Sequence, residues 1–275
     1  MSFGWIWPFG RRSRRAAEQR LEQERRQLAA ARERLLALVR PSTRLSFRQL
    51  EEDDKMTPAM SHAGGAPYAE AGDDWPPCSG CGEPLEHIVQ VDLRRCPVRP
   101  TTAYDLVVLF YCLRCFPWGI DREREAGQWL VRTYRAPDDG RAIALEPPAR
   151  GVADTCAIDA ERFDMLPLWD ELVAHDRVLA ETLDTIDDGW EVLVEDLAEF
   201  VPEQNAATTV GGYPLWVQSD DAPVARDGAE RRRFELLLQL DSEPVPGWMW
   251  GDAGMLYLFI DPGDPHDVRL VVQCH

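Results

Sequence analysis

The sequence predicts an α+β protein in which two mainly antiparallel β units, related by internal duplication, pack together with an N-terminal helix, an acidic helical linker and a four-cysteine element. Three observations carry this prediction. Strand-like apolar patterns recur at a fixed offset, apolar residues near the N-terminus follow heptad spacing, and two Cys-x-x-Cys pairs fall within one β unit. The expected divisions are a basic N-terminal arm and helix over residues 1–50, a first β repeat over 51–150, an acidic helical linker over 151–205 and a second β repeat over 206–275.

The N-terminal arm begins with aromatic residues within 3–9, continues with four arginines within 11–15, and then places Leu or Ala at helical spacing as far as Leu38. Neither Pro nor Gly interrupts the stretch after the arginines begin, so we expect a helix of about 25 residues. Aromatic and arginine side chains suit contact with a membrane surface. Four glutamates dilute the basic face, however, and favour packing on the body or a short coiled coil.

Two strand-like segments recur in the second half of the chain at an offset of 149 positions. L-E-H-I-V-Q-V-D at 85–92 matches F-E-L-L-L-Q-L-D at 234–241, and L-V-V-L-F at 106–110 matches M-L-Y-L-F at 255–259. A Gly-Gly-x-Pro motif precedes the first segment of each pair. A single unit of this kind exposes an apolar sheet face, and a second copy supplies its cover.

The matched segments also place a Gln and an Asp at equal positions, namely Gln90 with Asp92 and Gln239 with Asp241. A Gln inside an apolar strand more often satisfies the backbone groups of a neighbouring loop than takes part in catalysis. We therefore expect structural roles for all four residues.

Acidic residues dominate the chain outside the N-terminal arm. The formal net charge is -18, although residues 1–50 hold twelve Arg against four Glu, and residues 154–203 hold sixteen Asp or Glu against two Arg. Scattered apolar residues within 154–203 predict short acidic helices. An acidic body repels phosphate backbones, so we expect no nucleic-acid partner and favour a basic protein or a cation; charge that serves only solubility is the alternative.

Four of the seven cysteines form two close pairs, Cys78 with Cys81 and Cys112 with Cys115. Each pair is expected on a tight turn, and strand pairing would bring the two turns together as in a zinc ribbon. The sequence therefore predicts a structural Zn²⁺ held by these four residues, with a redox dithiol or unrelated core cysteines as the alternatives. Four thiolate ligands leave no position for a water ligand, so the metal is expected to stabilise the fold and not to catalyse.

The other cysteines, Cys96, Cys156 and Cys274, have no partner in the sequence. An odd number of cysteines in this arrangement favours a reducing compartment over a disulfide framework. The apolar run of the N-terminal arm precedes its arginines, which is the reverse of a secretory signal. We therefore expect a cytoplasmic protein.

Three motifs of the second repeat carry a family resemblance: G-G-Y-P-L-W-V-Q at 211–218, L-L-L-Q-L-D-S at 236–242 and W-G-D-A-G-M-L-Y-L-F-I at 250–260. They resemble the bacterial YwqG-like family of unknown function, and the likeness covers residues 61–275. The Gly-Gly-x-Pro, Cys-x-x-Cys, Q-x-D and Phe-x-Cys-x-x-Cys motifs of the first repeat are similar, more distantly, to the programmed-cell-death-protein-two family, whose members act as ribosomal-protein chaperones. The resemblance implies a duplicated α+β fold, supports zinc, and implies a binding role without supplying a catalytic residue.

Taken together, these patterns favour a non-enzymatic, zinc-stabilised protein-binding module, chaperone-like or immunity-like, with a basic protein client. The alternative is an enzyme with a cleft between the two repeats, lined by Trp216, Trp248 and Trp250, in which Asp252 acts. The sequence contains no G-x-S-x-G, no phosphate-binding glycine loop and no H-E-x-x-H, so it predicts no particular reaction.

Overall fold

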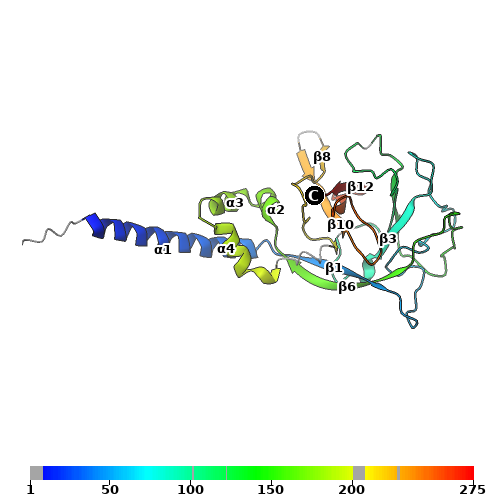
Figure 1. Ribbon diagram of the computed structural model, residues 1–275, viewed down its shortest axis with the longest axis horizontal. Coiled ribbons are helices and arrows are strands. Elements are labelled where there is room, and N and C mark those ends of the chain that lie inside the picture. Colours follow the sequence, from blue (N-terminus) through cyan, green and yellow to red (C-terminus); the bar gives the residue numbers. More distant parts are fainter. Residues whose placement is uncertain (1–8, 101, 122, 201–207, 228–229) are drawn as a thin grey trace, which may run out of the picture. The chain divides into compact units, whose positions relative to one another are not determined.

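The computed structural model describes residues 9–100, 102–121, 123–200, 208–227 and 230–275, and it has the predicted α+β composition (Figure 1). The chain forms two compact units. Residues 1–39 and 166–201 make a helical unit, and residues 40–165 and 202–275 make a sheet unit. Most of the N-terminal aromatic segment lies outside the described residues. Among those described, every helix is too short or too polar to span a bilayer.

The helical unit contains the long helix α1 (Phe9–Leu36), the short helices α2 (Trp169–His175), α3 (Arg177–Asp184) and α4 (Gly189–Asp196), and a 3₁₀ turn η2 (Ala198–Phe200). The N-terminal helix and the helices of the acidic segment are thereby confirmed. Their common core consists of apolar side chains spaced one helical turn apart, including Ala31, Leu35, Leu172, Leu179, Leu183, Leu193 and Leu197. The Asp176 side chain begins α3 by accepting the N–H of Leu179 at 3.0 Å, and it also binds Arg34 at 2.6 Å.

The sheet unit is built on one ten-stranded sheet in the order β12-β11-β10-β7-β1-β6-β2-β3-β4-β5, and the pairings are antiparallel. The strands are β1 (Arg40–Gln49), β2 (His62–Ala63), β3 (Glu86–Asp92), β4 (Leu106–Tyr111), β5 (Trp129–Tyr134), β6 (Cys156–Met165), β7 (Thr209–Val210), β10 (Glu235–Asp241), β11 (Met255–Asp261) and β12 (Asp264–Gln273). A separate hairpin pairs β8 (Val224–Asp227) with β9 (Glu230–Arg233). We refer to β2, β3, β4 and β5 as the first strand group, and to β7, β10, β11 and β12 as the second strand group.

Strands β1 and β6 pair with each other at the centre of the sheet, within segments where the sequence predicted an arm and a helical linker. Neither strand has a strong apolar alternation, so periodicity did not reveal them. Antiparallel backbone pairing holds the two strands together, and complementary charges add to it. Arg44 binds Glu161 at 3.1 Å directly across the pair, and Arg48 binds Asp159 at 3.2 Å.

The sheet curls so that its inner face encloses one core, and side chains from both strand groups meet there. Leu109 of β4 and Leu258 of β11 belong to this same buried cluster. The alternate residues of these strands, such as Phe110 and Phe259, are also buried, in two further clusters on the outer face. Burial on both faces explains why β4 and β11 read as continuous apolar runs.

The two strand groups share the same pairing register. β3 pairs with β4 with an irregularity between His87 and Val89, and β10 pairs with β11 with an irregularity between Leu236 and Leu238. These bulges lie 149 positions apart, which is the offset of the sequence repeat. Such bulges fix register, so the equal placement is a specific geometric feature of both groups.

The two glutamines have the structural role that was predicted for them. Gln90 accepts the backbone N–H of Tyr68 at 2.6 Å, and Gln239 accepts that of Leu215 at 3.1 Å. Both side chains are fully buried, and each fixes the loop that follows a Gly-Gly-x-Pro motif.

Candidate metal centre

The two Cys-x-x-Cys pairs lie at loop ends of the first strand group. The turn that carries Cys78 is closed by its N–H, which donates to the carbonyl of Glu83 at 2.7 Å, and by the N–H of Gly82, which donates to the carbonyl of Cys78 at 2.8 Å. Cys112 directly follows β4, and its N–H donates to the carbonyl of Gln128 at 2.9 Å. Backbone hydrogen bonds therefore contribute to the position of both pairs.

The structure brings the four predicted ligands, Cys78, Cys81, Cys112 and Cys115, into one cluster, with all four Sγ atoms within 4.8 Å of one another. The Sγ atoms of Cys78 and Cys115 are 3.7 Å apart, and those of Cys81 and Cys112 are 3.6 Å apart. A regular tetrahedron of sulfurs at the Zn–S bond length has edges of about 3.8 Å. The cluster can thus hold a tetrahedral metal ion with little movement.

Backbone N–H groups point at the sulfurs, as the knuckle of a metal ribbon requires. The N–H of Gly80 donates to Sγ of Cys78 at 3.4 Å, and the N–H of Cys115 donates to Sγ of Cys112 at 3.3 Å. Such bonds stabilise the negatively charged form of the sulfur.

The cysteines influence one another's ionisation. Burial acts to raise the pKa of Cys78, but hydrogen bonds from the Cys81 backbone and from the neighbouring thiols outweigh it, so this pKa lies below its usual value. Burial raises the pKa of Cys112, and burial together with the other thiols raises that of Cys115 to about 12. One thiolate therefore disfavours the next, and four thiolates in this space require a cation to balance them.

The cluster is continuous with the hydrophobic core of the first strand group. Cys78 and Cys112 are buried among Leu85, Phe110 and other apolar side chains on the outer face of the sheet, whereas the remaining two cysteines are half-buried. A ligand held here would tie the turn before β3 to the end of β4. No disulfide links any of the seven cysteines.

In the second strand group, acidic residues occupy the positions that correspond to the cysteines. One of them, Asp261, is buried and binds Arg232 through two bonds of 2.5 and 2.7 Å. Within the described ranges, no second group of metal-binding side chains comes together. An ion pair thus lies where the first group has a sulfur ligand.

The residues of the alternative enzyme hypothesis do not line one cleft. Trp216 stacks on Phe259 on the outer face of the sheet, with ring centroids 5.7 Å apart. Trp248 and Trp250 lie in the inner core, and both indole N–H groups donate to the carbonyl of Asp241, at 2.8 and 3.2 Å. The sequence could not reveal this separation, because these tryptophans lie outside the periodic strand segments.

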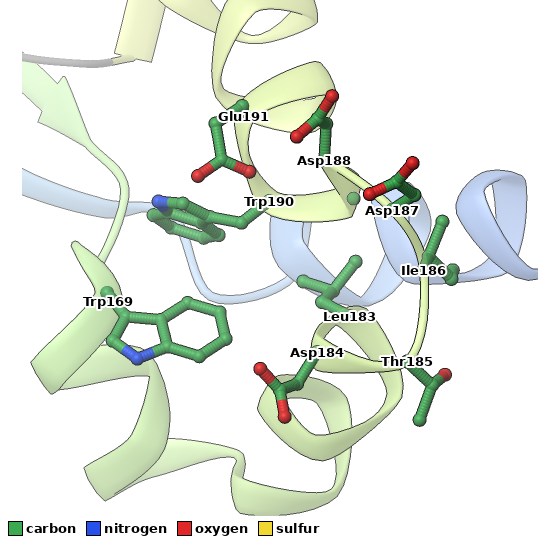
Figure 2. A pocket seen from close by; sticks show the side chains of 10 residues that line it. Trp169, Leu183, Asp184, Thr185, Ile186, Asp187, Asp188, Trp190 and Glu191 are labelled. Atoms are coloured by element: carbon green, nitrogen blue, oxygen red, sulfur yellow. The ribbon is translucent and has the colours of Figure 1, made fainter.

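The helical unit carries a further pocket that the sequence did not predict, with a volume of about 650 Å³ (Figure 2). Its floor includes Trp169 and Trp190, whose rings meet edge to face at 5.5 Å. Asp184 and Glu191 lie beside the indole rings, and two more aspartates precede α4 on the adjoining turn. Aromatic faces ringed by carboxylates provide an environment that favours a cation.

A family model described as a domain of unknown function, DUF1963, matches residues 61–269. The chain belongs to the DUF1963 family. The match begins just before β2 and ends within β12, so it includes the first strand group, the second group except the end of β12, and all four clustered cysteines. It confirms the expectation of a domain family of unknown function over this part of the chain, and the N-terminal helix lies outside it. No curated protein matches the chain.

Proposed function

We propose that this DUF1963 protein is a non-enzymatic protein-binding module whose sheet is stabilised by a structural Zn²⁺ at Cys78, Cys81, Cys112 and Cys115. The observation that carries the metal assignment is the spacing of the four sulfurs, which lie within 4.8 Å of one another in two Cys-x-x-Cys turns. Zinc is favoured over harder cations because all four donors are sulfur.

The chemistry of the cluster supports a structural role. Four protein ligands complete a tetrahedral site and leave no position at which a water molecule could be activated. The bound ion would join the turn before β3 to the end of β4, and would neutralise thiolates that otherwise repel one another. Free thiols throughout the chain also fit a reducing compartment such as the cytoplasm.

Metal analysis of the purified protein tests the site directly. We expect about one zinc ion per chain in the native protein and none in Cys78→Ser, together with a lower unfolding temperature for the variant. Cys96→Ser is the matched control, since Cys96 is a half-buried cysteine outside the cluster. Equal zinc content in native protein and Cys78→Ser would rule the assignment out.

We further propose that the two strand groups are copies of one ancestral unit. The support is the shared offset of 149 positions, at which the strand register, the bulge and the buried Gln recur. The loop residues that the two glutamines bind, Tyr68 and Leu215, recur at an offset of 147. The resemblance to YwqG-like proteins and, more distantly, to programmed-cell-death-protein-two chaperones supports a duplicated fold with a binding role by analogy.

A basic protein is the partner that the charge distribution favours. The net charge of -18 is concentrated outside the N-terminal arm, and the pocket of Figure 2 adds carboxylates around two indole rings. We expect a native pull-down at low salt to enrich basic proteins that about 0.5 M salt releases. The double variant Asp184→Asn and Glu191→Gln should reduce that enrichment, and an unchanged set of captured proteins would count against this pocket.

A further inference from the structure

The ten-stranded sheet has two free edges, and these edges approach the same core. β5 is bonded to a strand only on its β4 side, and β12 only on its β11 side. Val131 of β5 and Val268 of β12 nevertheless pack against the same inner cluster. The two terminal strands therefore border a seam where the curled sheet is not closed by strand pairing.

The backbone of β12 directs hydrogen-bonding groups into this seam. The N–H of Val272 donates outward to the carbonyl of Trp118 at 3.0 Å, away from β11. Because such groups alternate along an antiparallel strand, the N–H and C=O groups of Leu270 and Val268 face the same side. Gly119 covers Leu270, since a Cβ built on Gly119 would lie 1.9 Å from the Leu270 carbonyl oxygen. Within the described part of the chain, no hydrogen bond covers Val268 on that side.

A pocket of about 600 Å³ lies along this edge, lined by residues 268–271 of β12 together with Trp129 and Ile120. Trp129 is only half-buried, and the large apolar side chain of Ile120 is 83 % exposed. Exposed apolar surface thus lies next to unpaired backbone groups. That combination is what an added β-strand covers.

The charges around the pocket indicate what kind of strand would fit. Glu125 and Asp221 line it, as does Arg269. Arg269 is bound to Asp267 at 2.6 Å and lies over the ring of Phe234, so its charge is offset within the protein. The remaining lining charge is negative and complements a basic segment.

We propose that an extended segment of a basic partner adds as a strand to the free edge of β12 at Val268. Its backbone would bond the outward groups of Val268, its apolar side chains would cover Trp129 and Ile120, and its basic side chains would face Glu125 and Asp221. The proposal rests on the proposed function, because it assigns a binding surface on the sheet unit for the basic partner expected there, in addition to the pocket of Figure 2.

A peptide of about ten residues with alternating Val and Arg is a suitable probe, since that length matches one strand. N-methylation of every second amide gives a matched peptide with the same side chains and charge, but without donors along one edge. Two N-methylated forms, one for each edge of the peptide, should differ in affinity. The form that lacks donors on the edge facing β12 should bind at least about tenfold more weakly than the parent, and the other form should bind nearly as well. The parent should also shift the NMR signal of the Val268 amide.

Ile120→Ser should weaken peptide binding several-fold, whereas Val178→Ser, which alters a 62 % exposed residue of α3, should leave it unchanged. Equal affinity for both N-methylated forms would mean that charge alone drives binding and would overturn strand addition. Failure of the parent peptide to bind would also overturn it. Neither result would bear on the zinc content of the protein or on salt-sensitive capture of basic proteins, which test the proposed function separately.

Discussion

The two strand groups share a register but stabilise it by different means. In the first group, the loop ends that flank β3 and β4 converge on four cysteines. In the second group, one of the corresponding positions holds Asp261, which pairs with Arg232, and aromatic rings fill the core on that side. The strand arrangement does not itself require a cysteine cluster, since the second group keeps the same register with an ion pair in that place. The four-cysteine cluster belongs to the loops of the first group.

Metal removal should have the largest effect, and it should affect the first strand group more than the second. A strong zinc chelator should speed hydrogen exchange of the β4 and β5 amides by more than about tenfold, while β11 amides change less, because only the first group loses a ligand that joins its loops. Exchange measured by mass spectrometry would resolve the two groups. Cys78→Ser serves as the control, since the chelator should change nothing further in it. Equal acceleration in both groups would show that the metal stabilises the sheet as a whole.

Replacement of the buried glutamines should affect the two groups alike. Gln90 accepts the Tyr68 N–H and donates to the carbonyls of Pro58 and Met60 at 2.7 and 2.6 Å. Gln90→Leu leaves the buried Tyr68 N–H without its acceptor and removes the two bonds that Gln90 donates, so it should reduce the free energy of unfolding by about 2 to 4 kcal/mol. Gln239→Leu should have a similar effect in chemical denaturation. A large effect in only one group would contradict the proposed equivalence of the two.

Asp92 and Asp241 lie two residues after these glutamines, and their substitution should affect the stability of the protein differently. Asp92 is buried and binds Arg94 at 2.8 Å, so Asp92→Asn should lower stability by about 1 to 3 kcal/mol. Asp241 lies near Glu243 instead, and burial raises its pKa above the usual 3.8. Asp241→Asn should therefore leave stability at neutral pH unchanged or slightly higher.

The contribution of Asp241 to stability depends on pH, because its pKa is raised in the folded protein. Because the folded protein holds this proton more tightly than the unfolded chain, Asp241 favours folding below its unfolded pKa, and this contribution disappears as the pH rises through the raised folded pKa. Denaturation of native protein and Asp241→Asn between about pH 3 and pH 7 measures the difference. Parallel pH profiles for the two proteins would show that this carboxyl does not contribute.

Residue patterns predicted much of the first strand group and of the metal centre. The sequence pattern identifies the apolar runs of β4 and β11 and the Q-x-D segments of β3 and β10, and the Cys-x-x-Cys spacing identifies the four cysteines that cluster. β1 and β6 could not be found in this way, because they are held by backbone pairing and by ions such as Arg44 with Glu161. The face on which Trp216 packs and the free edge of β12 depend on contacts between distant segments, which no local pattern encodes.

Substitution of Gly80, which lies beside the sulfur of Cys115, should have the mildest consequence. A Cβ at this position would lie 3.0 Å from Sγ of Cys115 and 3.1 Å from Nε2 of Gln128. Gly80→Ala should therefore displace one sulfur by a few tenths of an ångström and weaken zinc binding up to about tenfold, without unfolding either strand group. Competition with a coloured chelator measures the affinity. Gly140→Ala is the control, because its Cβ would meet only the flexible Asp138 carboxylate, at 3.3 Å. If Gly80→Ala binds zinc as tightly as the native protein, the cysteine turns tolerate a Cβ at this position. Zinc binding would then not depend on the close approach of Gly80 to Sγ of Cys115.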